Sequence, residues 1–148
     1  MKNFFIDSDF NHLMSEHIKE NLDLLLAKNK EFSILVNIAE VEFDPKLPEY
    51  IESNFKPLTL FAIAGYTFET FEIYEDYILF EAGFGAENIG SVLTIPTHSI
   101  IQIIVDDTPI FINLSRKVDP KKQQSKIQRS KNIFLSNPEN QKYLKNRK

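Results

Sequence analysis

Between residues 31 and 114 the chain carries short apolar, often β-branched runs that alternate with polar residues and are separated by close turns. Alternation with a period of two is typical of strands that bury one face. The expected strands are 31–43, 58–64, 66–73, 77–82, 91–95, 100–105 and 110–114. No helical pattern separates them, as a parallel sheet with crossover helices would require. The pattern therefore predicts an antiparallel barrel or sandwich.

A single helix is expected ahead of these strands. Apolar residues recur at steps of three and four from Phe10 to Leu26, with charged residues between them, and this spacing predicts a helix over 9–28. Asp7, Ser8 and Asp9 supply candidates for the N-cap. One helix followed by closely spaced strands gives an α+β fold class that is mostly β.

Charge divides the chain into two parts. Residues 116–148 hold 11 of the 17 Lys and Arg residues and two acidic residues, whereas residues 1–115 hold 6 basic and 19 acidic residues. The formal charges are therefore +9 and −13, and we expect an acidic folded domain over 1–115 and a basic, flexible or partly helical tail over 116–148. Such a tail suits a nucleic-acid arm, a tether that docks on an acidic partner, or a solvated extension lying on the acidic body.

Composition argues against several classes of site. The chain has no cysteine, which excludes disulfides, thiolate metal sites and cysteine nucleophiles, and its three histidines leave little room for a metal site. It has no Gly-rich phosphate-binding motif and no catalytic constellation, so we expect neither an enzyme nor a cofactor. Its apolar runs are far shorter than the roughly 20 residues that span a bilayer, and its first residues do not form a signal peptide. A cytoplasmic protein without a membrane partner is expected.

Glycines and aromatic residues mark the most distinctive part of the folded domain. Three of the four glycines, Gly83, Gly85 and Gly90, fall within eight residues around Phe84. They fit either a bulge and loop at a sheet corner, or a place where a peptide backbone or another ligand approaches the sheet closely. Tyrosines near turns could line a groove, and Phe71 and Phe80 are expected in the core. The tyrosines in question are Tyr66, Tyr74 and Tyr77.

Five runs of the folded domain resemble the stringent starvation protein B (SspB) family. They are Leu-Thr-Leu-Phe-Ala-Ile-Ala at 58–64, Phe-Glu-Ile at 71–73, Ile-Leu-Phe-Glu-Ala-Gly-Phe-Gly-Ala at 78–86, Val-Leu-Thr-Ile-Pro at 92–96 and Ile-Ile-Gln-Ile at 100–103. The likeness extends over about 9–114 in the order of elements, and the specific part is 80–103. The resemblance implies a small, half-open SH3-like or Sm-like β-barrel with an N-terminal helix that mediates homodimerisation.

The same resemblance implies a function. SspB-like proteins are adaptors without a cofactor, which bind the tag that tmRNA adds to stalled nascent chains and deliver it to the ClpXP protease. The residues matched to the peptide-binding motif are Phe80, Gly83, Phe84, Gly85 and Ala86. A tail motif at Tyr143, Leu144 and Lys145 would dock on the N-terminal domain of ClpX.

The chain departs from the family pattern at several positions. Gly83 stands where the family usually has Arg, Ala86 replaces a second Gly, and 87–90 lengthen the loop. The alternative is a small-barrel, Sm-like nucleic-acid-binding protein that uses its basic tail, because the acidic body would repel phosphate.

Overall fold

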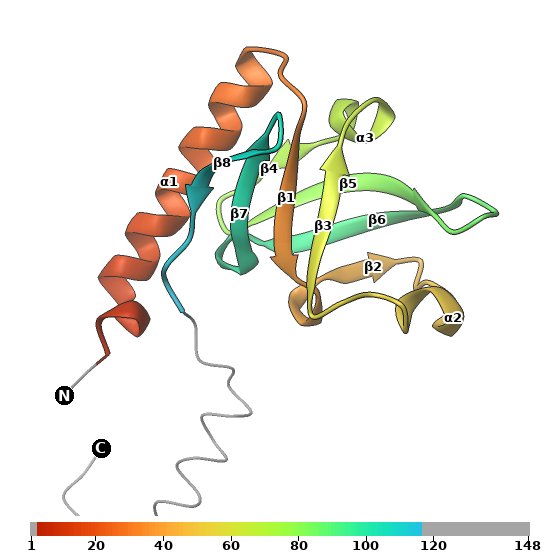
Figure 1. Ribbon diagram of the computed structural model, residues 1–148, viewed down its shortest axis with the longest axis horizontal. Coiled ribbons are helices and arrows are strands. Elements are labelled where there is room, and N and C mark those ends of the chain that lie inside the picture. The colour runs from red at the N-terminus through yellow and green to blue at the C-terminus, as the bar shows by residue number, and fades with distance from the viewer. Residues whose placement is uncertain (1–2, 117–148) are drawn as a thin grey trace, which may run out of the picture. The chain divides into compact units, whose positions relative to one another are not determined.

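The computed structural model describes residues 3–116 (Figure 1). A 3-10 turn (Phe4–Ile6) leads into α1 (Ser8–Ala27), which confirms the predicted helix to within a residue at each end. Asp7 is its N-cap, since the side chain accepts a hydrogen bond from the Phe10 N–H at 3.0 Å. The helix ends where Asn29 adopts a positive φ of 54°, a conformation that asparagine tolerates well.

Within residues 3–116, eight strands form two separately hydrogen-bonded antiparallel sheets of four. The first sheet has the order β3-β1-β7-β8, and the second has the order β2-β6-β5-β4. The first contains β3 (Leu58–Ile63), β1 (Phe32–Asn37), β7 (Ile100–Val105) and β8 (Thr108–Ile112). The second contains β2 (Glu42–Asp44), β6 (Ile89–Pro96), β5 (Tyr77–Phe84) and β4 (Glu72–Ile73). The α+β class is thus confirmed, while the strands do not join into one closed barrel.

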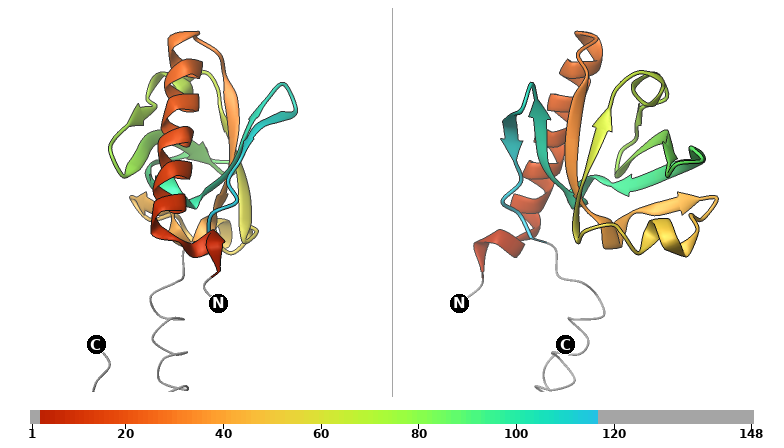
Figure 2. Two further views of the ribbon diagram at one scale, coloured as in Figure 1. Left: turned by 90° about the vertical axis from the view of Figure 1, so that its left-hand side faces the viewer. Right: turned by 45° about the vertical axis from the view of Figure 1, so that its right-hand side comes forward.

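The core lies between the inward faces of the two sheets and α1. Burial alternates along β1, β5 and β6, as expected for strands with one face in the core. Ile18 and Leu22 of α1 are fully buried and belong to the same apolar cluster as Ile34, Phe80 and Leu93 of the sheets. Figure 2 shows α1 running beside the β7–β8 hairpin, while the β5–β6 hairpin extends away from the helix.

Two of the expected strands are wrong in detail. The run 31–43 is not one strand, because a 3-10 turn at Ile38–Glu40 breaks it after Asn37, whose side chain accepts from the Ala39 N–H at 3.2 Å. That turn carries the chain from β1 in the first sheet to β2 in the second. The run 66–73 is also not a strand; it forms the short helix α3 (Tyr66–Glu69) and the two-residue β4.

The region 83–90 is more regular than the sequence indicates. β5 continues to Phe84 and β6 begins at Ile89, so only a short turn separates two long paired strands. Another short helix, α2 (Glu49–Glu52), follows β2 and was not expected. Its Tyr50 hydroxyl donates to Glu87 at 2.7 Å and so links α2 to the tip of the β5–β6 hairpin.

The chain divides into two units, 1–116 and 117–148. Arg116, which the charge pattern assigns to the tail, contacts the beginning of the chain: its N–H donates to the Phe5 carbonyl at 2.6 Å, and its guanidinium lies 5.7 Å from the centre of the Phe5 ring. The second unit lies outside the described residues.

Candidate functional site

The outward face of the second sheet is built from rows of residues that the strand register places side by side. Glu81 on β5 pairs with Val92 on β6, and Val92 also pairs with Asp44 on β2. Two residues further along β5, Gly83 pairs with Gly90. Because residues two apart on a strand face the same side, the two rows form one continuous floor. The first row carries side chains, and the second consists of two glycines.

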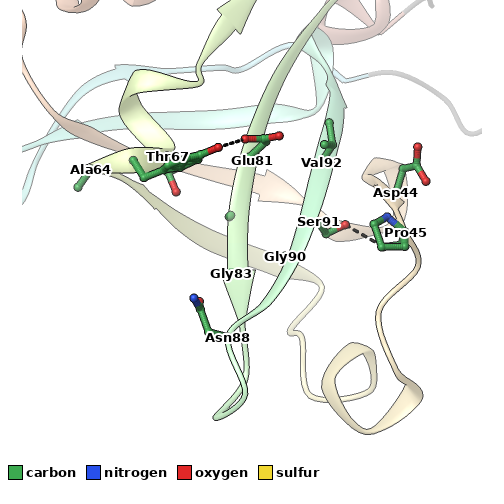
Figure 3. Close-up of a pocket in the computed structure, with 12 residues that line it drawn as sticks. Asp44, Pro45, Ala64, Thr67, Glu81, Gly83, Asn88, Gly90, Ser91 and Val92 are labelled. Atoms are coloured by element: carbon green, nitrogen blue, oxygen red, sulfur yellow. Dashed lines mark hydrogen bonds between the residues drawn. The ribbon is translucent and has the colours of Figure 1, made fainter.

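A pocket of about 700 Å³ opens over this floor (Figure 3). Tyr66 and Thr67 of α3 line one part of it, and Asp44 and Pro45, at the end of β2, line another. Its volume is within the range of pockets that hold ligands in other proteins. The lining residues are Asp44, Pro45, Ala64, Tyr66, Thr67, Glu81, Ala82, Gly83, Asn88, Gly90, Ser91 and Val92.

Hydrogen bonds hold the edges of the pocket in place. The Ser91 hydroxyl donates to the Pro45 carbonyl at 2.8 Å and fixes the segment after β2 against β6. The Tyr66 hydroxyl donates to the Glu81 carboxylate, which ties α3 to β5. This hydrogen bond and the negative charge of Glu81 raise the pKa of Tyr66 above its ordinary value.

Gly90 has no structural reason to be glycine. Its φ is not positive, and a Cβ added there would meet no atom within 4 Å. Glycine in a strand interior lowers stability and often marks a site where another backbone or a ligand comes close. Gly83 opposite also has an ordinary φ, but a Cβ there would lie 1.8 Å from Oδ1 of Asn88, whose side chain leans over it.

The outward face around the pocket is acidic. The four strands of the second sheet contain four acidic residues and no Lys or Arg. All four acidic residues point outward, because their neighbours along the strands pack into the core. They are Glu42, Asp44, Glu72 and Glu81. Such a face attracts cationic groups and repels phosphate.

The structure brings only one of the five predicted motif residues into the pocket. Gly83 lies on its floor. Phe80 is fully buried, with its ring stacked on Phe71 at 5.8 Å between centroids. Phe84 points inward into an aromatic cluster with Phe43, Phe55 and Phe61, all at ring-centroid distances of 5.6 to 6.2 Å.

The other two motif residues lie in the hairpin turn. Gly85 has a φ of 74°, which favours glycine, and a Cβ there would come 2.9 Å from Cδ1 of Ile51. Ala86 is exposed in the same turn. Phe80, Phe84 and Gly85 therefore build the hairpin that carries the pocket, and their part in binding stays a prediction. Tyr143, Leu144 and Lys145 lie outside the described residues.

Sequence reasoning missed most of the lining residues. Of the three tyrosines expected near a groove, Tyr66 lines the pocket, while Tyr74 and Tyr77 stack on each other at 4.8 Å between centroids and lie outside it.

The two carboxylates of the pocket, Asp44 and Glu81, have no distinguishing pattern in the sequence, because only the strand register shows that both lie beside Val92. The sequence pattern singled out Gly90 as one of three crowded glycines, but it did not predict that Gly90 pairs with Gly83.

Over residues 3–116, no group of three or more His, Asp or Glu side chains is arranged to hold a metal ion. In the same part of the chain, no helix has the length and apolar character needed to cross a membrane. No protein-family model matches the chain, and no curated protein matches it either.

Proposed function

We propose that this protein is a non-catalytic adaptor that binds an extended peptide in the pocket on the outward face of the second sheet. The observation that carries the proposal is the paired Gly83–Gly90 floor, in which Gly90 is required neither by φ nor by packing. The absence of a side chain at Gly90 leaves room for a group of the peptide to approach the floor of the pocket closely.

The pocket also adjoins an available sheet edge. β2 is the outermost strand on this side of the second sheet, and its Asp44 lines the pocket. An extended peptide that pairs with a strand edge gains main-chain hydrogen bonds, and its alternate side chains enter neighbouring pockets. The edge of β2 would supply the hydrogen bonds, and the pocket would accept a side chain.

The resemblance to SspB-like adaptors supplies the biological context. In this proposal the bound peptide is the tag of stalled nascent chains, and the adaptor delivers tagged substrates to ClpXP. Docking on the ClpX N-terminal domain would fall to Tyr143, Leu144 and Lys145, as the family pattern implies.

A homodimer through the N-terminal helix belongs to the same proposal. Leu13 and Leu24 are 47% and 54% exposed, although α1 already buries a separate apolar face in the core. Residues eleven apart on a helix lie about three turns apart on one side, so these two leucines share one side of α1, with the exposed His17 and Glu20 between them. Two exposed leucines on one side of a helix are apolar surface that an antiparallel or parallel copy of the same helix could cover.

Binding of a fluorescent peptide tests the proposal. A peptide carrying the host's tmRNA-encoded tag, titrated with the full chain and followed by anisotropy, should bind with micromolar or better affinity, and a scrambled peptide should not. Gly90→Val should weaken binding by about tenfold or more, because its side chain would occupy the floor. Thr94→Val, on the same face of β6 but outside the lining, should bind as the natural protein does.

If Gly90→Val and Thr94→Val bind the peptide equally well, the peptide does not bind over this floor. No binding by a folded natural protein, to either peptide, would reject the adaptor proposal as stated.

The charge division favours a second candidate, a small-barrel nucleic-acid-binding protein. Residues 116–148 carry a formal charge of +9, which suits contacts to phosphate. The acidic outward face of the second sheet makes that face unsuitable for nucleic acid, so binding of this kind would depend on the basic segment.

A further inference from the structure

We infer that the peptide taken by this pocket is cationic, with a Lys or Arg side chain lying over Val92 between the carboxylates of Asp44 and Glu81. The inference rests on the proposed function, because it names the chemistry of the peptide that the same pocket would bind.

The strand register places the two carboxylates on either side of an apolar residue. Asp44, Val92 and Glu81 occupy three neighbouring strands in one row, so the two acidic residues are two strand spacings, roughly 10 Å, apart. A Lys or Arg stem can pack on an apolar side chain while its charged end reaches a carboxylate. The row therefore matches one long cationic side chain better than an apolar or acidic one.

The groups around this row reinforce the preference. Glu81 is half-buried and its carboxylate is oriented by the Tyr66 hydroxyl, so the acceptor is held in one position before a ligand arrives. Glu42 and Glu72 lie in the next row of the same face, and no strand of this sheet contributes a cation. A ligand carboxylate in the pocket would meet only like charge from these strands.

The chain offers a matched control for Glu81. Glu87 also accepts a hydrogen bond from a tyrosine hydroxyl, that of Tyr50, but it does not line the pocket. Glu81→Gln and Glu87→Gln remove the same charge from the molecule and leave an acceptor for the same kind of donor. A difference in peptide affinity between the two variants would therefore come from the pocket carboxylate and not from the net charge of the molecule.

Selection from a displayed library of random ten-residue peptides tests the inference with the full natural chain. We expect the selected peptides to contain more Lys and Arg than the starting library. Replacing the preferred Lys or Arg of one selected peptide by norleucine should weaken its binding about tenfold. The Asp44→Asn and Glu81→Gln variants should bind the Lys or Arg peptide more weakly by a similar factor, while Glu87→Gln should bind it as tightly as the natural protein.

The outcomes separate this inference from the proposed function. Selected peptides with no excess of Lys and Arg, or a norleucine peptide that binds equally well, would overturn the inference and leave the peptide-binding proposal intact. An excess of Lys and Arg that Glu81→Gln and Glu87→Gln diminish equally would also overturn it, since the preference would then reflect overall charge. If a folded protein selects no peptide at all, the proposed function fails together with the inference.

Discussion

At the scale of single residues, the glycines of this chain serve different purposes, and substitution can tell them apart. Gly65 has a φ of 57° and a ψ of −129°, whereas Gly90 lies in a β-strand with no positive φ. A Cβ would meet nothing within 4 Å at either position, so the two sites differ in backbone conformation and not in available space. Substituting each glycine by alanine therefore compares a strained backbone position, Gly65, with an unstrained one, Gly90.

We expect Gly65→Ala to lower the free energy of unfolding by about 1–3 kcal/mol, because an L residue is strained in that conformation. Gly90→Ala should change it by less than about 0.5 kcal/mol or raise it slightly, since glycine in a strand carries an entropic cost. Urea unfolding followed by circular dichroism measures both. A large loss of stability in Gly90→Ala would mean that Gly90 is structural, which would remove the main support for a ligand at that floor.

At the scale of elements, the sequence predicted what local periodicity controls and failed where tertiary pairing decides. α1 and β7 were predicted to within a residue, because their apolar spacing repeats over many residues. β2 was merged with β1, since alternation continues through Val41 and Phe43 although the chain changes sheets between them and β1. The run 66–73, which contains α3, was predicted as a strand, and its Tyr66, Phe68 and Phe71 are aromatic residues with strong β preference.

The candidate site, too, could be predicted from the sequence only as far as local patterns reach. Crowded glycines indicated the right hairpin, but the pocket lies on the face of its paired strands and not in its turn. Asp44 and Glu81 are 37 positions apart, so nothing local to either residue could reveal that they share a row.

The exposed leucines of α1 lead to a prediction about assembly. Leu22 is fully buried, while Leu24 is more than half exposed on a different side of the helix. Leu24→Glu, alone or with Leu13→Glu, should leave the protein folded and convert a dimer into a monomer, because a carboxylate would be buried at the helix contact. Sedimentation equilibrium gives the mass, and circular dichroism the fold. A natural protein that is already monomeric at high micromolar concentration would refute the proposed dimer.

At the scale of the whole molecule, the separation of charge is the feature that distinguishes the two candidate functions. The described residues contain 19 acidic residues and six basic ones, and the outward face of the second sheet has no cation from its own strands. Peptide binding depends on that face, whereas nucleic-acid binding would depend on 117–148. The two activities should therefore respond differently to the removal of the basic segment and to salt.

A chain that ends at Arg116 makes the comparison, since this cut keeps the hydrogen bond from Arg116 to Phe5. We expect it to bind the tag peptide within about twofold of the full chain. Any RNA binding by the full chain should disappear in the shortened chain, and it should fall steeply with salt, because each phosphate contact releases counterions. Anisotropy with a labelled single-stranded RNA and with the tag peptide, at 50 and 200 mM salt, measures both.

RNA binding that persists in the shortened chain would place the nucleic acid on the acidic body and contradict the charge argument. Loss of peptide binding in a shortened chain that remains folded would instead make the basic segment part of the peptide site.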